Sequence, residues 1–228
     1  MVIILCNLCV LWLKYFMRVL ITAGPTREKI DPVRYISNYS SGKMGYALAE
    51  TAMKKGHSVT LVSGPVSLVP PKSVRTIFVE SAAEMAREVR RLAKSADLVI
   101  MAAAVADYTP AKFANDKIKK TNTSITLKLK RTEDILAGLG KTKRKGQLLA
   151  GFAAETSDLL KNACLKLARK NLDWIVANEV GKKDRGFSAD KNAVTMISRN
   201  GKKYSLPLQD KKSLAEKIIK ILTTEHTD

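Results

Sequence analysis

The chain has 228 residues, 46% of them hydrophobic, and its 40 Lys and Arg residues outnumber its 21 Asp and Glu residues to give a formal net charge of +19. This length supports one compact hydrophobic core, and no Pro-rich, Gly/Ser-rich or single-sign stretch divides the sequence. The excess positive charge would attract polyanions, but the sequence has no zinc-ligand spacing and no aromatic RNA-binding strand. We therefore interpret the charge as a solvated basic surface and keep nucleic-acid binding only as a rival class.

The N-terminal residues 1–16 are largely apolar. Their unbroken apolar run is shorter than the roughly 20 residues that span a bilayer, and they carry no basic start and no small-residue cleavage site. We expect a misassigned start codon in preference to a weak membrane anchor, and a functional domain over residues 17–228. Cys6, Cys9 and Cys164 form no disulfide framework, which is typical of a cytoplasmic protein.

From residue 18 onward, short apolar runs alternate with segments of helical periodicity. This alternation predicts an α/β fold, a Rossmann-like doubly wound sheet that is mostly parallel, has helices on both faces and ends in a β-hairpin. The run at 124–130 alternates apolar and polar residues, so one face of that strand is expected to be wet. In chain order, the expected elements are a strand at 18–22, a helix at 44–55, a strand at 57–62, a helix capped by Ser81, strands at 97–103, 124–130 and 147–153, a helix at 157–170, a strand at 172–177, a hairpin at 193–206 and a helix at 210–222.

Ligands of doubly wound sheets bind at the carboxyl ends of the strands, so we expect the chemistry just after residues 22, 103 and 153. The stretch ISNYSSGKMG, residues 36–45, places serines and glycines at the start of a predicted helix. Such a start offers unpaired N–H groups and a positive dipole end to an anion. The alternative is that Ser41 is an ordinary N-cap and Gly42 a turn residue. Because Asn38 and a second glycine accompany them, phosphate binding is favoured.

The glycine pattern argues against the usual nucleotide motifs. The turn after the first strand lacks G-x-G-x-x-G, the second strand ends in Ser-Gly-Pro instead of an acidic residue, and no G-x-x-x-x-G-K-[ST] P-loop is present. No Tyr-x-x-x-Lys pair is expected in a helix after the strand at 97–103. An NAD(P)-dependent oxidoreductase therefore remains a weak rival class.

Three further segments could contribute to a site. The small residues of 102–108 leave space for a ligand beside Asp107, although the same residues could serve packing alone. The lysines of KIKK, residues 117–120, could fold over a triphosphate and offset its charge, or form a solvated charge run. Phe152 could stack a base, or belong to the core. Two lysines that follow it, Lys166 and Lys170, could bind phosphates or lie on the surface, and no His or Cys residue has a partner for a metal cage.

Several motifs occur together and in order: GPTRE (24–28), DPVRYISNYSSGKMG (31–45), VTLVSGPV (59–66), AAAVADY (102–108), KIKK (117–120), GFAAET (151–156) and ANEVG (177–181). The chain thereby closely resembles the bacterial phosphopantothenate–cysteine ligase domain of coenzyme A biosynthesis over residues 18–222. In many bacteria a flavin-dependent decarboxylase domain precedes this domain. The resemblance does not include that domain, so a separate decarboxylase is a candidate partner.

The resemblance implies a two-step reaction. The carboxylate of 4'-phosphopantothenate attacks the α-phosphorus of CTP, with Mg²⁺ on the phosphates and no resident metal, and the amine of L-cysteine then displaces CMP from the acyl-cytidylate. Asn38 and Lys117 match catalytic positions, and Arg34 matches an arginine from the neighbouring subunit of a homodimer. Phosphopantothenate contacts are implied for Arg34, Asn38, Ala103, Ala104 and Asp107. Nucleotide contacts are implied for Gly24, Ser40, Gly42, Gly45, Asp107, Lys117, Glu133, Asp134, Ile135, Leu136, Phe152, Lys166, Lys170 and Asn178. The sequence departs from the family at Glu133, where proline is expected before Asp-Ile.

Overall fold

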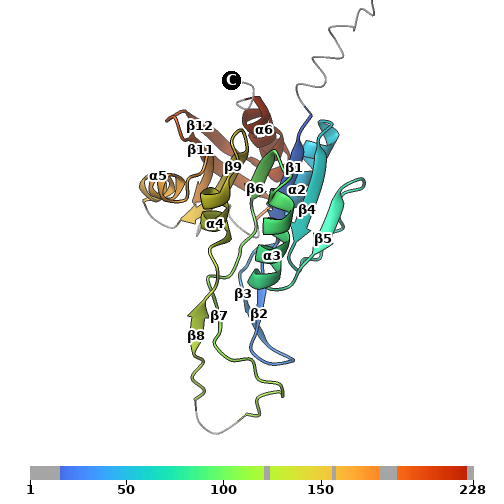
Figure 1. The fold of residues 1–228 in the computed structure, drawn as a ribbon, viewed down its shortest axis with the longest axis vertical. Coiled ribbons are helices and arrows are strands. Elements are labelled where there is room, and N and C mark those ends of the chain that lie inside the picture. The colour runs from blue at the N-terminus through green and yellow to red at the C-terminus, as the bar shows by residue number, and fades with distance from the viewer. Residues whose placement is uncertain (1–15, 121–123, 156–157, 180–188, 225–228) are drawn as a thin grey trace, which may run out of the picture.

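The computed structural model of the chain describes residues 16–120, 124–155, 158–179 and 189–224. An eight-stranded sheet forms its centre, in the order β12-β11-β10-β9-β6-β1-β4-β5 (Figure 1). The parallel strands are β1 (Arg18–Ala23), β4 (Ser58–Ser63), β5 (Arg75–Phe78), β6 (Leu98–Met101), β9 (Leu148–Glu155) and β10 (Trp174–Glu179). An antiparallel hairpin of β11 (Lys191–Ser198) and β12 (Lys203–Asp210) extends the sheet beside β10.

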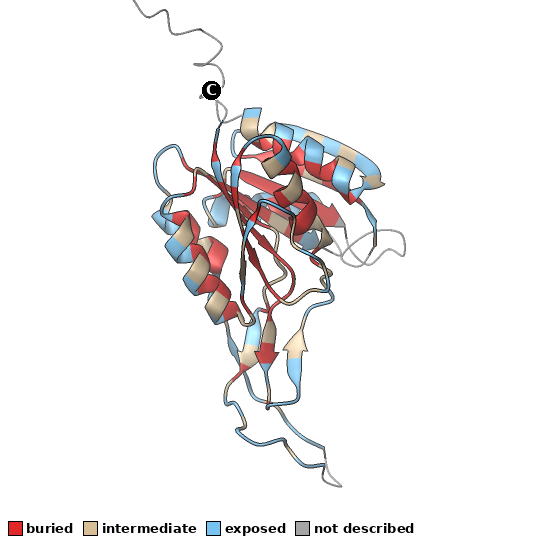
Figure 2. Cartoon of the chain, turned by 90° about the vertical axis from the view of Figure 1, so that its right-hand side faces the viewer, coloured by how far each residue is buried: buried red, intermediate tan, exposed pale blue. Residues whose placement is uncertain are grey.

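Helices cover both faces of this sheet, which confirms the doubly wound fold. On one face lie α2 (Lys43–Lys54) and α6 (Lys211–Thr224), and on the other α3 (Ala82–Ala93), α4 (Ile135–Thr142) and α5 (Leu159–Arg169). Strands covered on both faces are almost continuously apolar, as in the fully buried run of β6 (Figure 2). No helix in the described part of the chain is both long and apolar enough to cross a bilayer.

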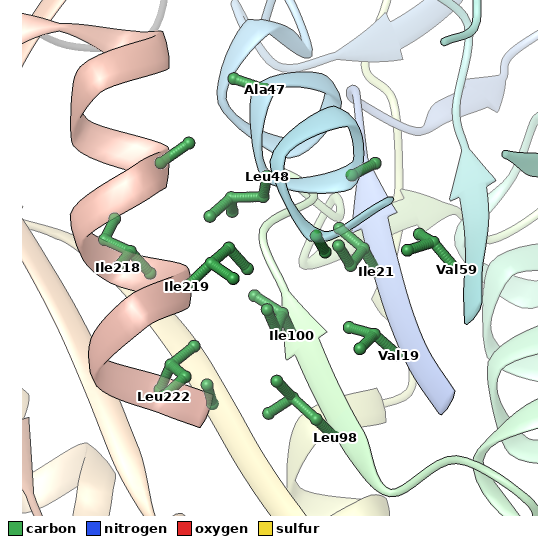
Figure 3. Packing of buried hydrophobic residues seen from close by; sticks show 14 of the residues in the cluster. Val19, Ile21, Ala47, Leu48, Val59, Leu98, Ile100, Ile218, Ile219 and Leu222 are labelled. Carbon is green, nitrogen blue, oxygen red and sulfur yellow. The ribbon is translucent and has the colours of Figure 1, made fainter. Parts of the chain in front are cut away.

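The core between α2, α6 and the sheet is close-packed. Ile21, Leu48, Ile100 and Ile219 are each 0% exposed and face one another across the strands and helices (Figure 3). Burial of each such side chain contributes about 1.5–3 kcal/mol to the free energy of unfolding. The first residues of α2 and α6 are therefore held side by side on a rigid support.

Two small antiparallel pairs project beyond the sheet (Figure 1). They are β2 (Arg27–Lys29) with β3 (Tyr35–Ser37), and β7 (Tyr108–Pro110) with β8 (Leu129–Arg131). A backbone hydrogen bond of 3.0 Å from Ala114 N to Ile30 O joins the two pairs. We call the described residues of 27–37 and 108–131 the arm.

The expectation for the strand at 124–130 was wrong in extent and placement. Only its end is a strand, β8, and this strand pairs with β7 outside the main sheet. All three residues of β8 are exposed, so neither face is buried. The alternation of apolar residues could not be used in a half-buried strand, because no core lies beneath this part of the arm.

The helices agree closely with expectation at 43–54, 82–93 and 211–224. The helix expected at 157–170 is observed at 159–169, and residues 156–157 and the predicted extension up to residue 15 lie outside the described residues.

Candidate functional site

A cavity of about 710 Å³ opens at the carboxyl ends of β6, β9 and β10. The chain runs from β1 to β4 and β5 on one side and then returns to β6 on the other, so strand order reverses between β1 and β6. This reversal is the position at which doubly wound sheets bind their ligands. The segments after residues 103 and 153 line the cavity as expected. The segment after residue 22 supports it from behind.

Most of the residues singled out in the sequence come together at this cavity. Gly24, Arg34 and Lys117 do not line it. The cavity is lined by Asn38, Ser40, Gly42, Gly45, Ala103, Ala104, Asp107, Glu133, Asp134, Ile135, Leu136, Phe152, Lys166, Lys170 and Asn178, among other residues.

Helix α2 begins without a side-chain cap. Its N-cap is Gly42 in the left-handed conformation (φ 76°), so the alternative in which Ser41 caps the helix is wrong. A Cβ atom on Gly42 would lie 2.8 Å from Val66 Cγ1 and 3.4 Å from Gly24 Cα, which leaves no room for a side chain and places Gly24 directly behind this turn. An uncapped helix start that lines a cavity can receive an anion.

Gly45 has a packing role of its own. A Cβ atom there would lie 2.5 Å from Ala23 Cβ and 2.9 Å from Thr22 O. Only glycine therefore lets α2 lie this close to β1. The close approach brings the start of the helix to the carboxyl edge of the sheet.

Hydrogen bonds between loops fix the position of three residues that are expected to contact phosphopantothenate, namely Asn38, Ala103 and Ala104. Ala103 N donates to Thr22 Oγ1 at 3.1 Å, and Ala104 N donates to Gly24 O at 2.9 Å. Asn38 Nδ2 in turn donates to Ala104 O at 3.0 Å. The loops after β1, β3 and β6 thus form one connected wall of the cavity.

The opposite wall is built on α4 and α5. Asp134 caps α4 by accepting a hydrogen bond of 3.0 Å from Ala137 N, and Lys170 Nζ lies 2.7 Å from Asp134 Oδ2. Burial alone would raise the pKa of Asp134, but the bonds from Lys170 and Ala137 outweigh it and hold that pKa below its usual range. Lys166 Nζ donates to Phe152 O at 2.9 Å. The cap at Asp134 shows that α4 starts normally despite Glu133.

Arg34 and Lys117 lie on the arm, where Asp31 organises the local structure. The buried Asp31 carboxylate accepts bonds from Arg34 Nε at 2.9 Å and from Ile118 N at 3.1 Å, and Arg34 Nη2 also donates to Ile118 O at 2.8 Å. The guanidinium of Arg34, followed by the backbone N–H groups of Val33 and Ile118, holds the pKa of Asp31 well below its usual range. Lys117 is exposed next to this network.

Among the further residues that line the cavity are Lys43, Asn192 and Lys211, to which the sequence assigned no binding role. Lys43 and Lys211 are the first residues of α2 and α6. The first turn of α2 has no acidic residue, whereas Asp210 Oδ1 caps α6 by accepting from Lys212 N and Ser213 N. The cation at the start of α2 reverses the usual charge preference, and for Lys43 this reversal was the available signal in the sequence.

Within the described ranges, no group of three or more His, Cys, Asp or Glu residues could cage a metal ion. Mg²⁺ in nucleotide sites is held mainly by phosphates, water and one or two carboxylates. Glu133 is bonded to Arg90 and Asp134 to Lys170, whereas Asp107 makes no ion pair with a described residue. The site therefore fits Mg²⁺ that arrives on a nucleotide, with Asp107 as the available carboxylate.

The cavity lies at the switch point of a doubly wound sheet, beside a glycine-lined helix start. This arrangement is typical of α/β proteins that bind nucleotides. The chain belongs to the family described as DNA/pantothenate metabolism flavoprotein C-terminal domain, which matches residues 16–225. The resemblance to the ligase domain of coenzyme A biosynthesis is thereby confirmed.

Several known proteins are similar to this chain in sequence or in structure. The chain is 52% identical over 202 residues to the coenzyme A biosynthesis bifunctional protein CoaBC of Bacillus subtilis, a match to 88% of this chain and 50% of that protein. The corresponding protein of Escherichia coli is 44% identical over 215 residues. The crystal structure of a CoaBC C-terminal domain is 47% identical with a TM-score of 0.79, covering 91% of this chain and 94% of that one. The chain spans about half the length of the curated relatives it matches.

Proposed function

We propose that the chain joins 4'-phosphopantothenate to L-cysteine with the consumption of CTP, giving 4'-phosphopantothenoylcysteine, CMP and pyrophosphate. The observation that carries this proposal is the shape of one cavity, in which Asn38 and Ala104 lie on the same wall as the uncapped start of α2 at Gly42. An acyl group and a phosphate can therefore occupy one site. Family membership agrees with this assignment.

The chemistry requires activation because a carboxylate is a poor acyl donor at neutral pH. The carboxylate oxygen forms a bond to the α-phosphorus while the bond to pyrophosphate breaks. The cysteine amine then forms a bond to the acyl carbon, loses a proton, and releases CMP. The protein mainly positions the groups and offsets negative charge, and Mg²⁺ bound to the phosphates would supply further charge neutralisation.

In this reaction Asn38 holds the acyl group, and Gly42 and Ser40 receive phosphate oxygens. The cavity wall formed by Phe152, Lys166 and Lys170 takes the rest of the nucleotide. A cytoplasmic decarboxylase would consume the product and is the proposed partner.

We further propose that the active form is a homodimer in which the arm of one subunit completes the cavity of the other. Arg34 and Lys117 lie on the arm and do not line the cavity of their own chain. The arm also exposes large apolar side chains, which is typical of an interaction surface. They are 42–60% exposed and comprise Val33, Tyr35, Tyr108, Phe113, Ile125 and Leu129.

The test is to mix the full chain with 4'-phosphopantothenate, L-cysteine and Mg²⁺ and to compare the four nucleoside triphosphates. We expect CTP to give one pyrophosphate and one phosphopantothenoylcysteine per turnover, measured by a coupled pyrophosphate assay and by mass spectrometry. Product formation with ATP but not CTP would contradict the nucleotide assignment. No product with any triphosphate would contradict the proposed function.

A further inference from the structure

Lys211 is a buried lysine in the cavity wall. It is 7% exposed, yet it lines the same cavity as Gly42 and Phe152. An ammonium group removed from water to this extent is stabilised only by nearby negative charge or hydrogen-bond acceptors. The charges around Lys211 therefore indicate which kind of ligand group can bind at this end of the cavity.

The hairpin and the packing of two helices place Lys211 there. Because β11 is antiparallel to both β10 and β12, β12 ends at the same edge of the sheet as β10, and α6 begins at that edge with Lys211. Asn192 lies at the same edge, paired with Gln209 of β12. Helix α6 packs against α2 (Figure 3). Lys43, the first residue of α2, lines the same cavity as Lys211.

Among the described residues at this end of the cavity, Lys43 and Lys211 share one neighbouring carboxylate. Asp190 is the neighbouring carboxylate; its Oδ1 lies 2.5 Å from Lys43 Nζ, and its side chain is 83% exposed. Burial, followed by the charge of Lys43, lowers the pKa of Lys211, and Asp190 opposes this only in part. Among the described residues, the Asp190 carboxylate thus faces two ammonium groups and the start of α2, which carries no acidic residue. The start of α6 is capped by Asp210, whose Oδ1 accepts from Lys212 N and Ser213 N. A phosphate group would balance this charge.

We propose that Lys211, with Lys43 and Asn192, binds a phosphate group of a substrate in the cavity. The inference rests on the proposed function and specifies one of its subsites. Two sources offer the same chemistry, the triphosphate of the nucleotide and the phosphate of 4'-phosphopantothenate. L-Cysteine has no phosphate and provides an internal control.

The test compares Lys211→Gln with Lys212→Gln, a matched variant that removes an exposed lysine next along the chain. Loss of a charge-assisted hydrogen bond predicts a rise of about 10- to 100-fold in the KM of one phosphate-bearing substrate. The KM of L-cysteine should be unchanged, and Lys212→Gln should behave as the parent protein. A rise for CTP alone identifies the triphosphate as the ligand, and a rise for 4'-phosphopantothenate alone identifies the monophosphate.

A second variant and a direct binding measurement keep the test decisive. Asn192→Asp adds a negative charge at the same subsite and should raise the same KM, even if Lys211→Gln does not fold. Calorimetric titration with inorganic pyrophosphate and with inorganic phosphate should show weaker anion binding in Lys211→Gln than in Lys212→Gln. If the parent protein ligates its substrates but both Lys211→Gln and Asn192→Asp match Lys212→Gln, the subsite is refuted. If the parent protein is inactive but its anion binding depends on Lys211, the subsite stands and the proposed function fails.

Discussion

Asn38 Nδ2 donates a hydrogen bond of 3.0 Å to the backbone oxygen of Ala104, although the two residues are 66 positions apart in the sequence. Ala104 is itself held by the bond from its N–H group to Gly24 O. The Asn38 side chain is therefore oriented by the fold before any substrate binds. Pre-orientation of this kind lowers the cost of aligning reacting groups.

We predict that Asn38→Asp releases pyrophosphate from CTP but forms the amide about 100-fold more slowly, so that acyl-cytidylate accumulates. A carboxylate cannot donate to Ala104 O and would be repelled by it. Rapid quenching followed by mass spectrometry measures the intermediate. Asn200→Asp in the exposed turn between β11 and β12 is the control, because it retains the oxygen that accepts from Ser198 Oγ. Absence of the intermediate in Asn38→Asp would count against the proposed role.

The arm predicts complementation between two defective variants. Lys117→Gln should abolish CTP-dependent pyrophosphate release, because it removes the ammonium group of the arm that offsets the charge of the triphosphate. Lys112→Gln, which replaces an exposed lysine on the same arm, should not. If the arm acts on the partner, mixing Lys117→Gln with Asn38→Asp creates heterodimers with one fully intact site. Amide formation should then recover toward about one quarter of the parent rate, since half of the dimers are mixed and each has one intact site of two.

The mixed sample distinguishes the two arrangements of the arm. If Lys117 served the cavity of its own chain, both sites of every heterodimer would carry one substitution and mixing would restore nothing. Equal loss of activity in Lys112→Gln would show that the arm needs its total charge and not Lys117 in particular.

The sequence predicted α2, α3, α5, α6 and most strands of the sheet because long periodic segments have few alternative structures, but it gave no expectation for the short elements α4 and β5. The face of α2 and the glycine that follows it at Gly56 locate that helix within one residue at either end. By contrast, β2, β3 and β7 have three residues each, too few to show a period. Alternation at Ile125 and Leu129 was misleading because both side chains are exposed.

The candidate site was predictable where motifs follow the carboxyl ends of parallel strands, as they do for Ala104 and Phe152. Lys211 could not be found in this way. Its place in the cavity depends on the antiparallel hairpin and on the contact between α2 and α6, which are relations between distant segments. For Arg34 and Lys117, family resemblance gave a role that the geometry of one chain does not supply.

Asp31 predicts a pH-dependent contribution to stability. Its pKa is lower in the folded chain than the usual value of about 3.9, so its carboxylate stabilises the fold above that pH and loses this effect as the pH falls toward the folded-state pKa. We expect Asp31→Asn to be less stable than the parent near neutral pH, with a difference that shrinks below about pH 4. Urea unfolding across this range measures it. Asp116→Asn, an exposed substitution on the same arm, should show a smaller difference, and a constant gap at all pH values would contradict the role of Asp31.

Gly45→Ala tests whether the close approach of α2 to β1 is needed. The added methyl group would meet Ala23 Cβ at 2.5 Å and Thr22 O at 2.9 Å, so the helix must move away from the strand. Overpacking of this kind lowers the free energy of unfolding by about 1–3 kcal/mol. The matched control is Gly138→Ala inside α4, where a Cβ atom would meet only Glu133 Oε1 at 3.7 Å. That substitution should stabilise its helix by about 0.5–1 kcal/mol. Because displacement of α2 also moves the helix start that lines the cavity, Gly45→Ala should weaken CTP binding as well. A variant as stable as the parent, with unchanged urea midpoint and CTP affinity, would show that α2 does not require glycine at this position.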